Sequence, residues 1–291
     1  MNSHNALRGI LLTCVVALIF ACMDSLAKAL AVLHGVVLMT WMRYLVQAVL
    51  LGGWLWSRQG VAAFRLNCPQ LQVVRGACQL GISLFFFSAL RFLPIGEATA
   101  VQFIAPLLVI LLAGPLLGER ARAAQGIAVL IGFAGVLIIV RPGGGLLTLA
   151  MLLPLGSAFC HALYQLLTRR IAGRDSVLLS NFMSGVVGLT GMTPLLFFFW
   201  NGIPDATALL GMAALGAIAM GGHLLMTQAF HYSSPVLLAP FSYLQILFAS
   251  VLGIFLFQHQ PDVGSLVGMA VIAAGGLFSL WLQTAHRRTR A

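Results

Sequence analysis

Two charged residues stand four positions apart inside an apolar stretch, Asp24 and Lys28 within residues 9–33. A spacing of four puts both on one face of a helix. Each disfavours membrane insertion by about 2.5 to 3.5 kcal/mol at the helix centre, whereas each Leu, Ile, Phe or Val favours it by only about 0.3 to 0.6. Such groups usually face a bundle interior or a wet cavity. Asp24 therefore either meets a cationic substrate group or a coupling proton, or forms a structural pair with Lys28 or Arg43. We favour function for Asp24 and structure for Lys28, which can snorkel outward.

Arg43 lies deep in the next apolar run, residues 35–56, too far from the outer surface to reach it with ease. A guanidinium can bind a carboxylate or phosphate bidentately. It can equally be a fixed counter-ion for Asp24, which is the role we favour because intramembrane charges tend to pair.

A polar stripe recurs near the middle of the chain, where His161, Tyr164 and Gln165 are spaced three and four apart. This spacing places an imidazole, a phenol and an amide on one helix face. We expect the stripe to line a cavity, although a lone membrane histidine such as His161 is more often a helix-to-helix contact than a proton relay.

Two further amides, Gln102 and Gln245, lie close to prolines, Pro106 and Pro240, and Tyr243 accompanies the second. Proline within a spanning helix frees carbonyls one turn earlier, which a cavity or another helix must satisfy. We therefore expect bends in both helices and assign Gln102, Tyr243 and Gln245 to the cavity.

Among the aromatic residues, Trp41 and Phe241 are our candidates for pocket walls. The clusters 85–87 and 197–200 are expected to face lipid or the membrane interface.

Three other polar residues receive structural interpretations. Glu97 suits the positive start of a helix and has Arg91 close by. Arg75 is expected to anchor its helix at the cytoplasmic surface. His223 follows two glycines, which favours close helix packing there.

The composition excludes a water-soluble domain. Of 291 residues, 60% are hydrophobic and 8% charged, with mean hydropathy +1.02, against about 25% charged in soluble domains. The net charge of +10 suggests nucleic acid, but the arginines flank apolar runs in small groups and form no basic face. The five cysteines show neither a CxxC pattern nor metal-type spacing. Nucleotide-binding, serine-hydrolase and metalloprotease motifs are missing from the sequence, so we expect no enzyme, cofactor or metal.

The apolar runs predict an all-α integral membrane protein, because about 20 apolar residues span a bilayer and continuous runs exclude a β-barrel. Ten candidate transmembrane helices follow from the breaks at charges, prolines and polar clusters: 9–33, 35–56, 70–92, 94–117, 122–140, 147–171, 177–200, 206–230, 234–257 and 263–284.

Basic residues set the orientation. With the amino terminus inside, twelve arginines fall on the cytoplasmic side, Arg75 among them, and only Arg91 and Arg141 fall outside. Both termini are therefore predicted to be cytoplasmic, in an inner membrane.

An internal repeat divides the chain. Residues 89–100 can be laid on 229–240 at an offset of 140, and 26–31 on 167–172 at an offset of 141. Residues 1–141 and 142–291 then hold five helices each, and an odd number inverts the second copy, as in secondary transporters with a midplane site. The second offset places Gln165 opposite Asp24.

The chain resembles the EamA-type transporters of the drug/metabolite transporter superfamily over almost its whole length. The residues that carry the resemblance are Ala89-Leu-Arg-Phe-Leu-Pro-Ile-Gly-Glu-Ala-Thr-Ala, Ala105-Pro106, Leu117-Gly118-Glu119-Arg120, Gly132-Phe-Ala-Gly-Val-Leu-Ile-Ile-Val-Arg-Pro142 and Ala239-Pro-Phe-Ser-Tyr-Leu244. The resemblance implies two inverted five-helix repeats around a central cavity, with the fifth and tenth helices peripheral. A subgroup with Asp24 in the first helix is similar to S-adenosylmethionine or riboflavin carriers.

One departure concerns Glu119: the second half has Gln258-His-Gln260 where many relatives repeat a Gly-Glu pair. The local structural tie that we expect of Glu119 is therefore not duplicated.

These patterns favour a secondary transporter of a small organic metabolite, amino-acid-like, zwitterionic or cationic, with S-adenosylmethionine as one compatible compound. A membrane receptor or scaffold that binds a ligand without moving it is the alternative. The expected partners are the substrate, membrane lipids and, if transport is coupled, protons, but no nucleic acid. Direction, coupling and oligomeric state stay open.

Overall fold

The computed structural model describes residues 3–93, 95–118, 123–140, 149–200, 202 and 204–257. Between 263 and 281 it describes only residues 263, 264, 266–268, 270, 271, 274, 275, 278 and 281. Most of the last predicted span, 263–284, therefore lies outside the described residues.

The described part is helical, and its helices follow the predicted spans closely. In chain order they are α1 (Ser3–His34), α2 (Val36–Gln59), η1 (Gly60–Phe64), α3 (Pro69–Ala89), α4 (Ile95–Gln102), α5 (Ala105–Leu117), α6 (Ala123–Val140), η2 (Leu149–Met151), α7 (Leu152–Ile171), α8 (Val177–Phe198), α9 (Ala206–Tyr232), α10 (Pro235–Ser242) and α11 (Leu244–Phe257).

Six stretches of the described chain are long and apolar enough to cross a membrane: Asn5–Ala31, Val36–Arg58, Pro69–Ala89, Val177–Phe198, Ala206–Tyr232 and Pro235–Leu256. The all-helical prediction thus holds for the described residues, and the chain is a multi-pass membrane protein. The number of ten spans stays a prediction.

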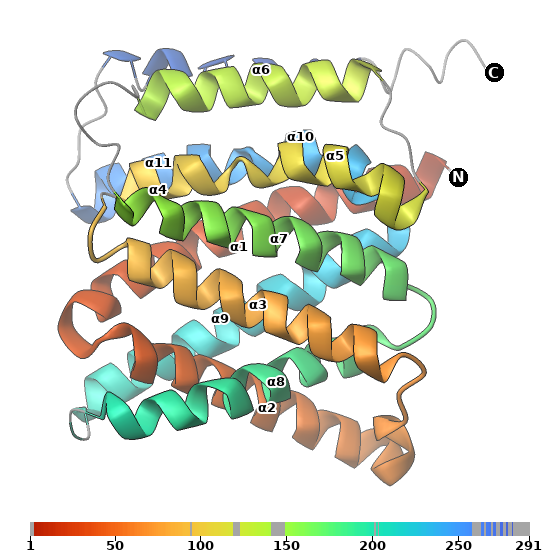
Figure 1. Ribbon diagram of the computed structural model, residues 1–291, viewed down its shortest axis with the longest axis vertical. Helices are drawn as coiled ribbons and strands as arrows, with labels where there is room; N and C mark the ends of the chain where they lie inside the picture. Colours follow the sequence, from red (N-terminus) through yellow and green to blue (C-terminus); the bar gives the residue numbers. More distant parts are fainter. Residues whose placement is uncertain are drawn as a thin grey trace.

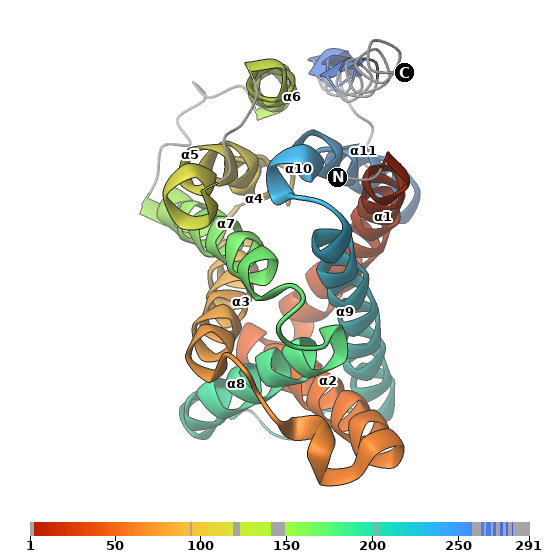
Figure 2. The same cartoon turned by 90° about the vertical axis from the view of Figure 1, so that its right-hand side faces the viewer.

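Helices far apart in the sequence lie side by side in matching pairs (Figures 1 and 2). Helix α1 packs on α9 while α3 packs on α7, and α2 packs on α8 between them. Likewise α3 also meets α8 and α2 meets α9, while α1 meets α11 and α7 meets α5. In the two halves α1 corresponds to α7, α2 to α8, α3 to α9, and α4 with α5 to α10 with α11. If each helix is replaced by its counterpart, the contact of α1 with α9 becomes that of α7 with α3, and the other contacts named here are exchanged or kept in the same way. A two-repeat fold therefore fits the packing.

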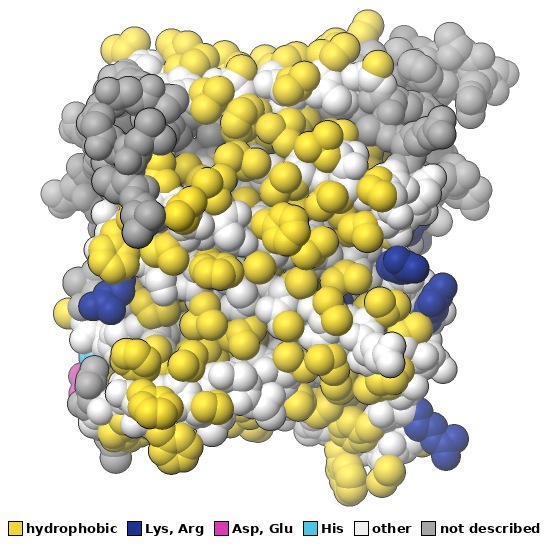
Figure 3. Space-filling model, viewed as in Figure 1, with side chains coloured by type: hydrophobic (Ala, Val, Ile, Leu, Met, Phe, Trp, Pro, Cys, Tyr) yellow, Lys and Arg dark blue, Asp and Glu magenta, His cyan; other side chains and the backbone are white. Residues whose placement is uncertain are grey.

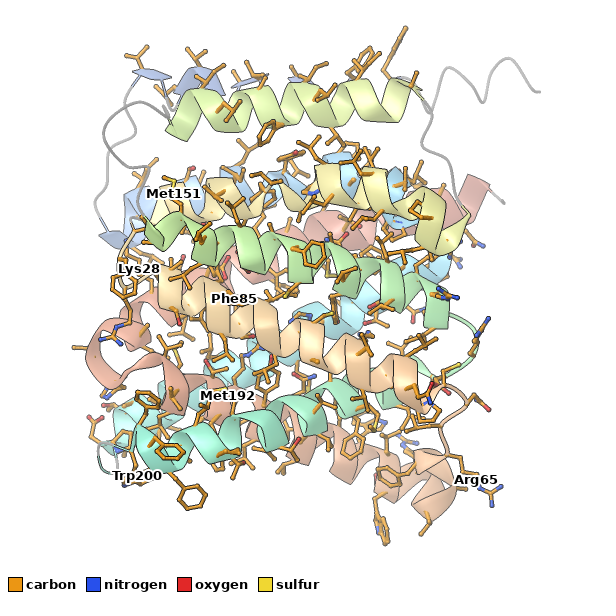
Figure 4. The ribbon with its side chains drawn as sticks, viewed as in Figure 1. Lys28, Arg65, Phe85, Met151, Met192 and Trp200 are labelled. Carbon is orange, nitrogen blue, oxygen red and sulfur yellow. The ribbon has the colours of Figure 1, made fainter. Side chains whose placement is uncertain are left out.

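Corresponding helices run in opposite directions. In Figure 4, Lys28 near the end of α1 and Met151 just before α7 lie toward the same end of the molecule, opposite Arg65. Helix α1 therefore runs toward that end and α7 runs away from it.

Small residues bring the paired helices close together. A Cβ at Gly188 of α8 would lie 2.5 Å from ring atoms of Tyr44 in α2, and one at Gly222 of α9 would lie 2.5 Å from Phe20 in α1. Aromatic rings on one helix thus occupy the space left by glycine on its partner.

Two of the predicted spans are interrupted, as the prolines led us to expect. The first break separates α4 from α5 at Phe103 and Ile104, and the second separates α10 from α11 at Tyr243. Phe103 and Tyr243 match at the 140-residue offset, and their rings stack on each other with centroids 5.4 Å apart. The Tyr243 hydroxyl donates to the Phe103 carbonyl at 3.3 Å, which is one of the carbonyls near the break.

The charged side chains on the surface that Figure 3 shows lie at its edges. Most of the Lys and Arg side chains lie along the right-hand edge, where Figure 4 labels Arg65, a smaller group lies at the left-hand edge, and the broad middle is hydrophobic. If the right-hand edge is the cytoplasmic one, this distribution agrees with the positive-inside rule.

Candidate functional site

Two adjoining hollows lie among the helices of both halves. The first, which we call the wide chamber, is lined by Thr13, Val16, Ala17, Phe20, Phe86, Thr99, Gln102, Phe103, Ala105, Pro106, His161, Gln165, Met226, Phe230, Leu238, Ala239, Ser242 and Gln245. The second, which we call the deep pocket, is lined by Phe20, Met23, Asp24, Arg43, Gln79, Ile82, Ser83, Phe86, Phe87, Gln102, His161, His223 and Gln245. Because Phe20, Phe86, Gln102, His161 and Gln245 belong to both linings, we treat the hollows as one site.

Asp24 lies at the wall of the deep pocket and is 4% exposed. Its Oδ2 accepts a hydrogen bond of 2.8 Å from Nε2 of Gln245, so that α1 of the first half meets α11 of the second. A buried carboxylate can accept several hydrogen bonds, and this one has a single donor among the described residues. It therefore has acceptor capacity left for a ligand.

Arg43 faces the same pocket from α2 and is 2% exposed. Its Nη2 donates to Oγ of Ser83 at 2.6 Å, and its guanidinium lies 4.4 Å from the ring centroid of Tyr44. The Nε of Arg43 has no acceptor among the described residues. The direct Asp24 to Arg43 ion pair that we favoured from the sequence is not formed, because the guanidinium is turned to Ser83; both charges instead border one space.

Amide groups with unused hydrogen-bonding capacity surround these charges. Both side-chain polar atoms of Gln79 and the Oε1 of Gln102 are buried without a partner among the described residues. Buried polar groups are normally hydrogen-bonded to protein or water. Unpartnered atoms from α3 and α4 in one pocket therefore have hydrogen-bonding capacity available to a polar molecule or water.

The wide chamber is mostly apolar, with walls such as Val16, Met226 and Leu238. Gln165 lines this chamber, and His161 lines both hollows. An amphipathic ligand can thus place its charged groups in the deep pocket and an apolar part in the chamber.

Several residues that the sequence assigned to the cavity lie elsewhere. Trp41 donates from Nε1 to Oγ1 of Thr193 at 3.1 Å and lines neither hollow, because it faces α8. Phe241 is buried in the main apolar core, and Tyr243 is occupied by its stack on Phe103. Tyr164 is also outside both linings, since its hydroxyl belongs to the cluster described next.

Arg75 corrects the sequence interpretation most strongly. We expected a surface anchor, but the side chain is fully buried. All five of its N–H groups have acceptors on α7, α8 and α9: Oγ1 of Thr168 at 2.7 Å, the Ser180 carbonyl at 2.7 Å, Oγ of Ser184 at 2.7 Å, the Tyr164 hydroxyl at 2.8 Å and Oγ1 of Thr227 at 3.0 Å. We call these residues the Arg75 cluster. A position near the helix start did not reveal it, because the acceptors come from three other helices.

Three residues of the sequence assignment remain. Lys28 lines a basin near the end of α1 together with His34 and Arg91. Glu119 lies outside the described residues, and the side chain of Glu97 does too.

The sequence interpretation missed Gln79, Ser83, Phe86, Phe87 and His223, which line the deep pocket. A usable pattern was present: Gln72, Arg75, Gln79 and Ser83 recur three and four apart and form a polar stripe on α3. The cluster 85–87 was assigned to lipid as a unit, yet only Phe85 is exposed while Phe86 and Phe87 are buried. Within the described residues no group of three His, Cys, Asp or Glu side chains is placed to hold a metal ion.

A family model described as the EamA-like transporter family matches the chain twice, at residues 7–141 and 148–281. A riboflavin transporter of Vibrio cholerae is 26% identical over 298 residues, which cover 99% of this chain and 98% of that protein. An S-adenosylmethionine uptake transporter of Rickettsia prowazekii is 23% identical over 76% of this chain and 75% of its own. A pseudopaline exporter of Pseudomonas aeruginosa is 26% identical over 91% and 93%.

Among solved structures, one titled only as the crystal structure of a protein superposes with a TM-score of 0.80 at 21% identity, covering 95% of this chain and 98% of that one. This likeness concerns the fold.

Proposed function

Because this chain belongs to the EamA-like transporter family, we propose that it is a secondary transporter that moves a small zwitterionic or cationic metabolite across the inner membrane. The substrate binds in the deep pocket and the adjoining chamber. A cationic group lies against Asp24, and a carboxylate or another acceptor lies against Arg43.

The observation that carries this proposal is that two opposite charges border the same pocket. Asp24 and Arg43 both border the deep pocket without forming an ion pair, and the amides of Gln79 and Gln102 beside them keep unpartnered atoms. An isolated ion in a low-dielectric site is unstable unless paired and hydrogen-bonded. A ligand that carries both charges would complete each of these groups at once.

The names of the relatives support a small organic metabolite as the substrate. Their names specify riboflavin, S-adenosylmethionine or pseudopaline. S-adenosylmethionine carries both an ammonium group and a carboxylate, so it is one compound that is compatible with Asp24 and Arg43 together. Both uptake and export occur among these names, so the direction is left to experiment.

The movement proposed is alternating access between two inverted halves, 1–141 and 142–291, with both termini in the cytoplasm. Support comes from two matches of the family model and from counterpart helices that run in opposite directions. Since the pocket wall is formed by α1 to α4 together with α7, α9 and α11, rocking one half against the other changes access to it.

Uptake into proteoliposomes tests the proposal. Purified protein is reconstituted, and radiolabelled S-adenosylmethionine is offered alongside a panel of amino acids, nucleosides and vitamins. We expect saturable accumulation of at least one zwitterionic or cationic compound. Ligand binding without flux would favour a receptor, and a folded protein that moves nothing in the panel would count against a transporter.

A further inference from the structure

The Tyr164 hydroxyl links the Arg75 cluster to the deep pocket. This hydroxyl accepts from Nη2 of Arg75 at 2.8 Å and lies 3.3 Å from Nδ1 of His223. His223 itself lines the deep pocket beside Asp24 and Arg43. The chain of contacts therefore runs from a fully bonded guanidinium, through a phenol, to an imidazole at the site.

The direction of these bonds fixes which ring nitrogen carries the proton. Arg75 can only donate, so the Tyr164 oxygen accepts from it and keeps its own proton to give away. Nδ1 of His223 is the acceptor at hand, and Tyr164 is fully buried, which makes an unused hydroxyl proton unfavourable. Nδ1 is then bare, and Nε2 bears the hydrogen of a neutral imidazole.

The ring is held firmly in this orientation. Its centroid lies 5.0 Å from the ring of Phe20 and 5.5 Å from that of Tyr164, the latter edge-on. The Thr227 hydroxyl, itself an acceptor for Arg75, donates to the His223 carbonyl at 2.7 Å. Nε2 has no partner among the described residues, although the ring borders the pocket.

We infer that His223 is a substrate-binding residue that presents a fixed, uncharged Nε2–H donor to the deep pocket. There it gives a hydrogen bond to the same acceptor group, a carboxylate, that Arg43 attracts. Tyr164 and Arg75 are positioning residues that act through the ring of His223. This inference rests on the proposed function for the identity of the acceptor, but the proton position can be tested without any substrate.

Nitrogen NMR of the reconstituted protein, labelled in its histidines with ¹⁵N, tests the proton position. The resonances that vanish in the His223→Gln variant are assigned to His223. We expect a protonated Nε2 and a bare Nδ1 in the wild type, and a mixture of the two neutral forms in Tyr164→Phe. The control Tyr232→Phe, which removes a phenol at the end of α9 away from the site, should change nothing. A proton on Nδ1 in the wild type would overturn the inference.

Binding measured by calorimetry then tests the acceptor. The probes are S-adenosylmethionine and its decarboxylated form, which lacks the carboxylate. For S-adenosylmethionine we expect His223→Leu to weaken binding about tenfold or more, the range of a hydrogen bond to a charged group. His223→Gln, whose amide N–H reaches a similar place, should stay within about threefold, and Tyr164→Phe should lose about threefold.

Every variant should lose less than about twofold in its affinity for the decarboxylated form, because this probe lacks the carboxylate that would accept the hydrogen bond. Equal losses for both probes, or none for either, would refute a contact between His223 and a carboxylate. If the wild type binds neither probe, the proposed substrate fails, while the proton position from NMR still decides whether His223 presents its donor.

Discussion

Two buried arginines, Arg75 and Arg43, are used in opposite ways. Arg75 directs five N–H groups to five neutral acceptors on α7, α8 and α9. Arg43 makes one side-chain hydrogen bond, to Ser83, and leaves its Nε without a described acceptor. Both are at most 2% exposed. Burial therefore does not distinguish the two arginines; the number of unused donors does, and Arg43 is the one that borders the deep pocket.

The acidic residues repeat this contrast. Asp175, in the turn between α7 and α8, accepts from the Asn67 backbone N–H at 2.8 Å, from the Asn67 amide at 3.1 Å and from Gln72 at 2.9 Å. Among the described residues, Asp24 accepts only from Gln245. Arg75 and Asp175, which have several hydrogen-bond partners each, lie outside both hollows. Arg43 and Asp24, which have one described side-chain partner each, line the deep pocket.

The largest effect should follow from Asp24→Asn. The amide keeps an acceptor for Gln245 but loses the charge, so we expect transport to fall by roughly a hundredfold or more, the cost of removing one partner of a buried charge pair. Uptake into proteoliposomes measures this loss. Asp175→Asn is the matched control: it should lower thermal stability and leave the initial rate unchanged. Normal transport by Asp24→Asn would contradict the different roles that we assign to Asp24 and Asp175.

Arg75→Lys should produce the largest loss of stability. Lysine offers three donors at one point in place of a five-donor fork, and interhelical hydrogen bonds in membranes contribute about 0.6 kcal/mol each. We expect unfolding in detergent to be easier by about 1 to 3 kcal/mol, depending on whether two or all five of these bonds are lost. Arg58→Lys, on the exposed end of α2, should stay within about 0.5 kcal/mol of the wild type. An equal effect of both variants would contradict a completed cluster.

Arg43→Gln should affect substrate binding more than stability, the reverse of Arg75→Lys. Because only one hydrogen bond and the contact with Tyr44 are lost, stability should change by about 1 kcal/mol. The KM for a carboxylate-bearing substrate should rise about tenfold. Unfolding and uptake are measured on the same preparation. A stability loss larger than that of Arg75→Lys would show that the two arginines have the same role.

The smallest effect should come from an exposed carboxylate, Asp205. It caps α9 by accepting from the Ala208 N–H at 3.1 Å, and the Thr207 hydroxyl holds its pKa below the usual 3.8. A lowered pKa stabilises the folded state above pH 3.8, and this contribution is lost as the pH falls further. Thermal unfolding of Asp205→Ala at pH 7 should therefore show a slight loss, that of Asp205→Asn almost none, and the difference between wild type and Asp205→Ala should shrink below pH 3.8.

The spans and their breaks could be predicted because they depend on local chemistry. Apolar runs bounded by charges placed α1, α2, α3, α8 and α9 within a few residues of their observed ends. Pro106 and Pro240 predicted interruptions, which the structure places at Phe103 and at Tyr243.

The partners of polar residues could not be predicted in the same way, because they depend on which helices meet. Arg75 looked like a surface anchor since its five acceptors lie 89 to 152 positions away in the chain. Asp24, Arg43, Gln102, His161, Gln165 and Gln245 were assigned to the cavity and do line it. Trp41, Tyr164, Phe241 and Tyr243 line neither hollow, because helix periodicity gives a face and not the neighbour on that face.

The stacked rings of Phe103 and Tyr243 have a mechanical consequence. Each residue lies at the interruption of its own helix, and the two are joined by a ring stack and by the hydrogen bond from the Tyr243 hydroxyl. We therefore expect a change of angle at one interruption to be accompanied by a change at the other. In the proposed alternating-access cycle, this link would make the two interrupted helices one shared hinge.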